Sequence, residues 1–183
     1  MARILNLETA STNCSVSIYQ RHQMRVLRED PSPEYTHGEL LHVFIREALE
    51  EAGLHPSDLD AVAVSKGPGS YTGLRIGVAA AKGLCFTLDI PLLAVNTLQS
   101  MASGFTFGSG VVIPMLDARR MEVYAAIYGL GHEELAPTRA EILTGDSFAD
   151  WAAAGPVHLI GNGAGKCREV LTHPNFSFPP QVQ

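Results

Sequence analysis

The chain has 183 residues, of which 46% are hydrophobic and 17% are charged, a balance typical of folded proteins and not of disordered ones. This length accommodates either one domain or two small ones. The formal net charge of −6 gives the chain as a whole no positive field that would attract a nucleic-acid backbone. If RNA is involved, we expect another chain to hold it.

Cysteine usage and hydropathy indicate the cellular setting. Cys14, Cys85 and Cys167 lie far apart and form no CxxC pair, so neither a disulfide framework nor a thiolate metal site is indicated. The N-terminus has no signal-peptide core, and no apolar stretch approaches membrane-spanning length. We therefore expect a soluble, cytoplasmic protein with no membrane association.

Strand and helix patterns alternate in the first half of the chain. Short apolar runs at 3–7 and 14–19 flank a polar turn and predict an opening hairpin. Apolar residues at a helical period then predict a helix over 36–52. The order continues with a strand at 61–65, a helix at 71–86, a strand at 91–95 and a short helix at 97–103. This succession predicts an α/β layer whose strands run parallel after the hairpin.

Local signals bound the first helix. Thr36 and Glu39 fit a capping box, in which each side chain bonds to the backbone of the other residue. Gly53 stands where a helix C-terminus favours a positive φ. Before this helix come a basic stretch over 21–28 and then the breaker Pro31-Ser32-Pro33, and no regular element is predicted for either.

The second half repeats the hairpin-first order. Strands are predicted at 111–115 and 122–128, followed by a looser region that contains Pro137. A helix at 148–154, a strand at 157–160 and a short helix near 167–171 complete the pattern. We therefore predict two subdomains, residues 1–103 and 104–183, and expect the second to be incomplete at its C-terminus.

The segment GPGSYTGLRIGVAAAKGL, residues 67–84, joins a glycine-proline turn directly to a helix. Such a turn can present backbone N–H groups to an anion at the helix start. Alternatively, Gly67 and Gly69 merely supply unusual backbone angles. The residue types leave both interpretations open.

A stripe of small residues runs along this helix, with Gly73, Gly77 and Ala81 at intervals of four. Each interior glycine costs up to about 1 kcal/mol relative to alanine, so we expect a compensating close contact on this side. Periodicity does not decide whether that contact lies inside the domain or on a partner. Our interpretation is a partner interface made by Gly73, Leu74, Gly77, Val78, Ala80 and Ala81, together with Leu41, Phe44 and Ile45 of the first helix.

Two apparent ligand motifs fail on spacing. GNGAGK, residues 161–166, is not a Walker A motif, because Ile160 and Cys167 stand where glycine and Ser or Thr are required. His37 and His42 are five residues apart, about 140° around a helix, so they do not share a side as a metal-binding pair would. A strand-to-helix turn and two solvated histidines explain these residues, and we predict no metal site.

The turn at 117–120 groups Asp117, Arg119 and Arg120 with Glu122. A carboxylate beside guanidinium groups could bind phosphate or adenine nucleotide. Turn chemistry explains most of the pattern, because an Asp that caps its own turn and an Arg that pairs with it need no ligand. No Ser/His/Asp or Cys/His arrangement is present in the sequence pattern, so we assign no catalytic residue.

Five segments resemble the TsaB (YeaZ) family: ILNLETASTNCSVSIY, YTHGELL, AVAVSKGPGSYTGLRIGVAAAKGL, PLLAVNTLQSMA and LDARRMEVYAAIY. The similarity runs over 4–128 and continues weakly through HLIGNGAG. It implies an actin-like ATPase fold with two RNase H-like subdomains. It also implies a non-catalytic subunit that binds a TsaD-like catalytic paralogue, which makes threonylcarbamoyladenosine in tRNA.

The resemblance has further implications for partners and cofactors. A TsaE-like ATPase joins the assembly, tRNA is contacted only indirectly through the complex, and a homodimer is compatible with the isolated chain. The chain itself requires no cofactor, although a nucleotide could bind at the interface of the complex. The catalytic paralogue carries two metal-binding histidines four residues apart in the segment that corresponds to YTHGELLH, whereas the spacing of five here implies a lost active site.

Two departures and two alternatives accompany this assignment. Many relatives have Asp where this chain has Glu8, and relatives continue for some tens of residues, so we expect a truncated C-terminus. One alternative is an active ATPase or sugar-kinase relative that uses the turns at Glu8, Gly67 and Gly161. The other, a metallopeptidase, follows only from older naming of the wider glycoprotease family.

Overall fold

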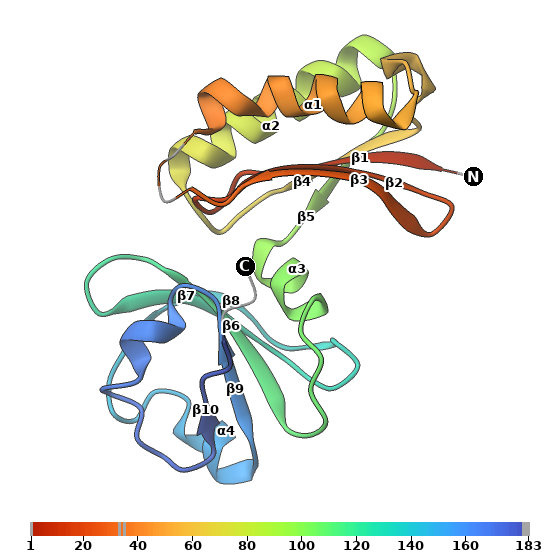
Figure 1. Cartoon of the computed structure of the whole chain (residues 1–183). Coiled ribbons are helices and arrows are strands. Elements are labelled where there is room, and N and C mark those ends of the chain that lie inside the picture. The colour runs from red at the N-terminus through yellow and green to blue at the C-terminus, as the bar shows by residue number, and fades with distance from the viewer. Residues whose placement is uncertain (1, 33, 35, 181–183) are drawn as a thin grey trace. The chain divides into compact units, whose positions relative to one another are not determined.

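The computed structural model describes residues 2–32, 34 and 36–180. The chain divides into two compact units, Met1–Thr97 and Leu98–Gln183. Each unit is built on its own five-stranded sheet (Figure 1). Among the described residues, no helix is long and apolar enough to cross a membrane.

The sheet of the first unit has the strand order β3-β2-β1-β4-β5. Its strands are β1 (Arg3–Glu8), β2 (Cys14–Gln20), β3 (Gln23–Asp30), β4 (Ala61–Ser65) and β5 (Leu92–Val95). The first three are antiparallel, whereas β4 and β5 run parallel to β1. Leu5 lies opposite both Ile18 and Val62, and all three side chains are fully buried.

Helices α1 (His37–Ala52) and α2 (Tyr71–Leu88) cover one face of this sheet (Figure 1). The short 3-10 helix η1 (Pro56–Asp58) follows α1. The predicted capping box is wrong, because the Thr36 side chain makes no cap and donates instead to Asp30 Oδ2 at 2.7 Å. The predicted C-terminus is confirmed, because Gly53 has φ 65° and its N–H bonds to the last carbonyls of α1.

The sheet of the second unit has the order β10-β9-β6-β7-β8. Its strands are β6 (Val111–Asp117), β7 (Glu122–Tyr128), β8 (Glu134–Ile142), β9 (Val157–Ile160) and β10 (Phe176–Ser177). The helices are α3 (Thr97–Ser103), α4 (Ala149–Ala154) and the 3-10 helix η2 (Ala164–Cys167). Apolar clusters cover both faces: Leu98 of α3 belongs to one, and Ala152 of α4 to the other.

The two sheets have the same topology, with three antiparallel strands followed by two strands parallel to the first. This order is that of an RNase H-like unit, and two such units in one chain form the actin-like α/β fold that the sequence predicts. Strands β3, β8 and the two-residue β10 were not predicted from the sequence. All three are edge strands, where charged residues and a proline such as Pro137 are tolerated because one row of backbone groups stays unpaired.

Candidate functional site

The turn after β1 is held by the chain's own carboxylate. Glu8 Oε1 accepts the Ala10 backbone N–H at 2.7 Å. Glu8 Oε2 accepts the hydroxyl of Ser65, at the end of the neighbouring strand β4. Both carboxylate oxygens are therefore engaged within the first unit.

The glycine-proline loop packs against the same turn. The Ser70 N–H donates to the Ala10 carbonyl at 2.6 Å, and the Ser70 hydroxyl caps α2 by accepting the Gly73 N–H. Gly69 has φ 156°, and a Cβ there would overlap the Ala10 carbonyl. Unusual backbone angles and close approach thus account for these glycines, and the Ser70 N–H is used inside the chain.

The glycine stripe of α2 also faces this turn. A Cβ on Gly73 would overlap the carbonyl oxygen of Thr9, and one on Gly77 would overlap the Thr9 hydroxyl. Ala81, on the same side of α2, is fully buried. The close contact that the sequence predicts exists, but it lies inside the first unit. The interpretation of this stripe as partner surface is therefore wrong, because the unit's own first turn fills the space.

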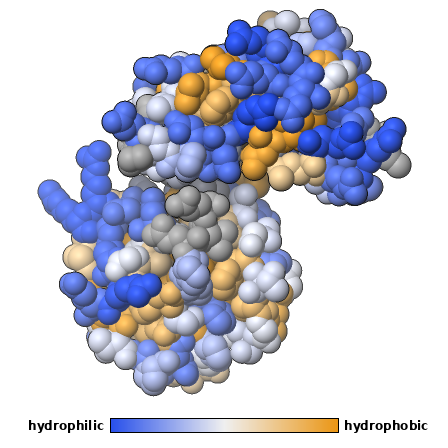
Figure 2. All heavy atoms as spheres, viewed as in Figure 1, coloured by the Kyte–Doolittle hydropathy of each residue, from blue (hydrophilic) through white to orange (hydrophobic). Residues whose placement is uncertain are grey.

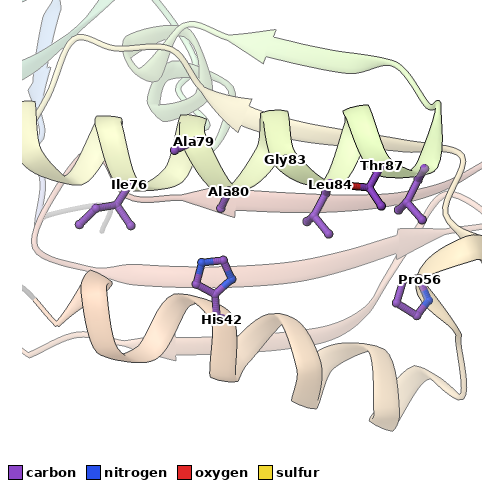
Figure 3. A pocket seen from close by; sticks show the side chains of 9 residues that line it. His42, Pro56, Ile76, Ala79, Ala80, Gly83, Leu84 and Thr87 are labelled. Atoms are coloured by element: carbon purple, nitrogen blue, oxygen red, sulfur yellow. The ribbon is translucent and has the colours of Figure 1, made fainter.

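The two histidines of α1 have different surroundings. The prediction of a solvated histidine is wrong for His37, which is 1% exposed. Its Nε2 lies 2.8 Å from the Ser11 carbonyl oxygen, so it helps to hold the turn after β1. His42 is exposed on the side of α1 that faces α2 (Figure 3). Within the described part of the chain, no group of three or more His, Cys, Asp or Glu residues is placed to hold a metal ion.

An open apolar groove of about 620 Å³ lies between α1 and α2 (Figure 3). It is lined by His42 of α1, by Pro56 of η1, and by residues of α2: Ile76, Ala79, Ala80, Gly83, Leu84, Thr87 and Leu88. Ala79, Ala80 and Gly83 contribute small side chains to this lining, and a Cβ on Gly83 would meet nothing within 4 Å. His42 is the one residue in this lining that carries an ionisable side chain.

A large aromatic side chain stands beside the groove. Phe86 is 90% exposed and follows Gly83 by three residues, so it lies close to Gly83 on the helix surface. Figure 2 shows apolar side chains gathered over α1 and α2 among hydrophilic ones. Exposure on this scale is unusual for phenylalanine.

The predicted interface residues are mostly in the core. Leu41, Ile45, Gly73, Gly77 and Ala81 are buried. Phe44, Leu74 and Val78 are half-buried, and Ala80 alone of the predicted set lines the groove. Sequence reasoning missed Ile76, Ala79, Gly83 and Phe86. For Ala79 and Phe86 the signal was available, because Ala79 is two residues from both Gly77 and Ala81, about 160–200° around the helix. Phe86 follows Ala79 by seven residues and therefore lies on the same side as Ala79.

The second unit carries a lysine-centred cluster at the end of β6. Lys166 Nζ donates to Asp117 Oδ1 at 2.6 Å and to the carbonyls of Arg120 and Glu122. Burial raises the pKa of Asp117, but the hydrogen bonds from Lys166 and from the Arg119 N–H, together with the charge of Lys166, outweigh it and hold that pKa below its usual value. Asp117 also caps its own turn by accepting the Arg119 N–H, as predicted. The predicted arginine partner is wrong, because Lys166 takes that place.

Comparisons with known proteins agree with this architecture. A family model described as "TsaD: tRNA N6-adenosine threonylcarbamoyltransferase" matches residues 33–179. A solved structure described as an uncharacterized protein from Pseudomonas aeruginosa with similarity to peptidase YEAZ is 30% identical, with a TM-score of 0.83 over 100% of this chain and 85% of that one. A second structure, YeaZ from Pseudomonas aeruginosa, is 29% identical with a TM-score of 0.79.

Two curated relatives are named TsaB. The TsaB proteins, named for tRNA threonylcarbamoyladenosine biosynthesis, of Bacillus subtilis and Escherichia coli are 39% and 35% identical, over 58% and 72% of this chain. The chain spans 46% and 59% of their lengths, about half of each protein. The fold and its turns thus define an actin-like protein of two RNase H-like units. Within that class, the chain belongs to the TsaB (YeaZ) family.

Proposed function

We propose that this chain is a non-catalytic subunit that binds a TsaD-like threonylcarbamoyltransferase and supports threonylcarbamoyladenosine biosynthesis in tRNA. A TsaE-like ATPase joins the assembly, and the same surface serves association with a second copy when the partner is absent. The observation that carries the proposal is the apolar groove between α1 and α2 with the exposed Phe86 beside it.

The polar groups of the turns are hydrogen-bonded within the chain, which supports a non-catalytic role. Both oxygens of Glu8 and the N–H of Ser70 are hydrogen-bonded within the first unit. In the second unit, Asp117 is neutralised by Lys166. A nucleotide-hydrolysing site needs free carboxylates for a metal ion and free N–H groups for phosphate, and here these groups already have partners in the chain.

The groove supports docking of an apolar helix face. Small residues such as Ala79 and Gly83 let a second helix approach closely, so that its side chains fit between α1 and α2. Burial of a side chain the size of Phe86 contributes about 1.5–3 kcal/mol, and such aromatic anchors usually dominate an interface. For these reasons we propose the outer side of α2, and not its glycine stripe, as the partner surface.

The test is the substitution Gly83→Gln. A side chain at this position meets nothing in the free chain, and replacing an interior helical glycine favours the helix by a few tenths to about 1 kcal/mol. We expect a folded protein with an unchanged or higher Tm that no longer co-purifies with the TsaD-like subunit of the same organism. Gly165→Gln, another glycine with open space around its Cβ position but in the second unit, is the matched control and should bind normally.

Two results would contradict the proposal. If Gly83→Gln captures the partner as well as the wild type does, the groove is not the interface. If the isolated chain binds ATP with micromolar affinity and turns it over, the chain is an enzyme of the actin-like class and not a scaffold.

A further inference from the structure

The tip of the hairpin of β2 and β3 carries a local concentration of positive charge, whereas the far end of β3 holds the acidic Glu29 and Asp30. Residues 9–28 contain Arg21, His22, Arg25 and Arg28 and no Asp or Glu, although the whole chain has a formal net charge of −6. The hairpin turn is made by Arg21 and His22, which have φ values of 56° and 60°. Two successive left-handed residues match the twist of a two-residue hairpin, so this basic tip has a defined backbone conformation.

Two of these arginines have no acidic partner. Arg28 pairs with Glu47 and Glu51 of α1. Arg21 and Arg25 are exposed, and neither makes an ion pair with any residue that the structure describes. The carboxylates of Asp58 and Asp60, across the sheet at the start of β1, are both bonded to Arg3. The charge at the tip is therefore free to meet an external anion.

The same hairpin tip exposes two large apolar side chains. Tyr19 is 39% exposed and Met24 is 58% exposed, and the two residues face each other across the hairpin. The register shifts between Ile18 and Tyr19, which leaves Arg25 as an extra residue in β3. Because strand side chains alternate, Tyr19 points to the sheet face opposite the buried Ile18, which is the face that α1 and α2 leave open (Figure 1).

We propose that the tip of this hairpin, residues 19–25, binds RNA directly. Arg21 and Arg25 contact backbone phosphates, and the Tyr19 ring stacks on an unpaired base. Free arginines next to an exposed aromatic ring are the combination by which proteins hold single-stranded segments without sequence preference. The choice of RNA as the polyanion rests on the proposed function. The hairpin tip adds a direct contact between this chain and the RNA to the indirect contact made through the complex.

The position of the tip also supports RNA as its ligand. It belongs to the first unit, at the end of the hairpin near the N-terminus, where Figure 2 shows a largely hydrophilic surface. The partner groove between α1 and α2 lies on the other face of the same sheet. A partner subunit and an RNA strand can therefore be bound by separate faces of one unit.

The experiment measures binding of a tRNA transcript by the full chain, alone and together with the TsaD-like subunit, over a series of KCl concentrations. Each phosphate contact contributes about 0.7–0.9 to the slope of log Kobs against log[KCl]. The double substitution Arg21→Gln/Arg25→Gln should therefore weaken binding and flatten this slope by about 1.4–1.8. Tyr19→Leu should weaken binding and leave the slope unchanged.

A charge-matched control separates the site from net charge. Arg139→Gln/Arg168→Gln removes the same two charges from the second unit, where Arg139 pairs with Glu141 and Arg168 stacks on Phe178, and it should bind tRNA like the wild type. The proposal is overturned if the wild-type chain binds no tRNA in either form, or if the Arg21→Gln/Arg25→Gln variant keeps the wild-type affinity and slope. It is also overturned if that variant loses binding to phosphatidylglycerol vesicles but not to tRNA.

The two proposals fail independently. Arg21→Gln/Arg25→Gln should capture the TsaD-like subunit normally, because neither residue lines the groove. Conversely, Gly83→Gln should leave the salt dependence of tRNA binding by the isolated chain unchanged. A loss of both activities in either variant would show that the two surfaces are not separate.

Discussion

Lys166 and Asp117, which are 49 residues apart in the chain, are joined by a hydrogen bond of 2.6 Å between Nζ and Oδ1. The same ammonium group holds the carbonyls of Arg120 and Glu122. All three of its protons are therefore used to fix the turn between β6 and β7. The turn needs this support, because Arg119 and Arg120 both adopt left-handed backbone angles, with φ values of 70° and 46°, which are unfavourable for side chains other than Asn, Asp or Gly.

Replacing Lys166 with Met should destabilise the second unit. The change keeps the aliphatic stem and removes three hydrogen bonds, and with a half-exposed carboxylate partner the expected loss in the free energy of unfolding is about 1–2 kcal/mol. The single tryptophan, Trp151, packs on the core of that unit, so its fluorescence during urea unfolding measures the effect. Lys82→Met, on an exposed position of α2, is the control, and an equal loss there would count against this account.

The stability of the second unit should fall at acid pH through Asp117. Its folded-state pKa lies below the ordinary value of 3.8, so its contribution is complete above that value and is lost as the pH falls through the lower folded-state pKa. Asp117→Asn should therefore be less stable than the wild type at neutral pH, with the difference shrinking as both are acidified. A constant difference across this range, followed by Trp151 fluorescence, would show that the charge of Asp117 does not stabilise the turn.

Substitutions at two glycines of α2 should differ in their effect on stability. Gly77→Leu places a side chain onto Thr9, whereas Gly83→Leu places one in open space. We expect Gly77→Leu to destabilise the first unit by about 1–3 kcal/mol or more through overpacking, and Gly83→Leu to change stability by less than about 1 kcal/mol. Thermal unfolding followed by circular dichroism compares them, and equal Tm values would mean that the first turn can move away from α2.

The three thiols should be unreactive in the folded chain. Burial raises the pKa of Cys14 and of Cys167 to about 11, and burial also raises the pKa of Cys85. Because the thiolate is the nucleophile, a disulfide reagent at neutral pH should label none of them until urea is added and should then label all three. Rapid labelling of the native protein would contradict the buried positions of these residues.

Much of the fold follows from the sequence, because hairpin turns and helical periods are local signals. The opening hairpin of each unit and the helices over 36–52 and 71–86 were predictable for this reason. The edge strands β3 and β8 were not, because exposed edge positions lack the alternation of buried strands. At the site, periodicity identified the side of α2 that needs a close neighbour but not the neighbour itself. That neighbour is Thr9, which is far from α2 in the sequence and meets it only in the folded chain. Lys166 is likewise far from Asp117 in the sequence and meets it only in the folded chain.

Helix α2 has different requirements on its two sides, and this limits how its sequence can change during evolution. The inner side must stay without side chains at Gly73 and Gly77 to leave room for the turn after β1. The outer side must stay small at Ala79 and Gly83 if the groove is to remain open. A larger side chain on the inner side should reduce stability, and one on the outer side should reduce partner binding. We therefore expect this segment to diverge more slowly than α1.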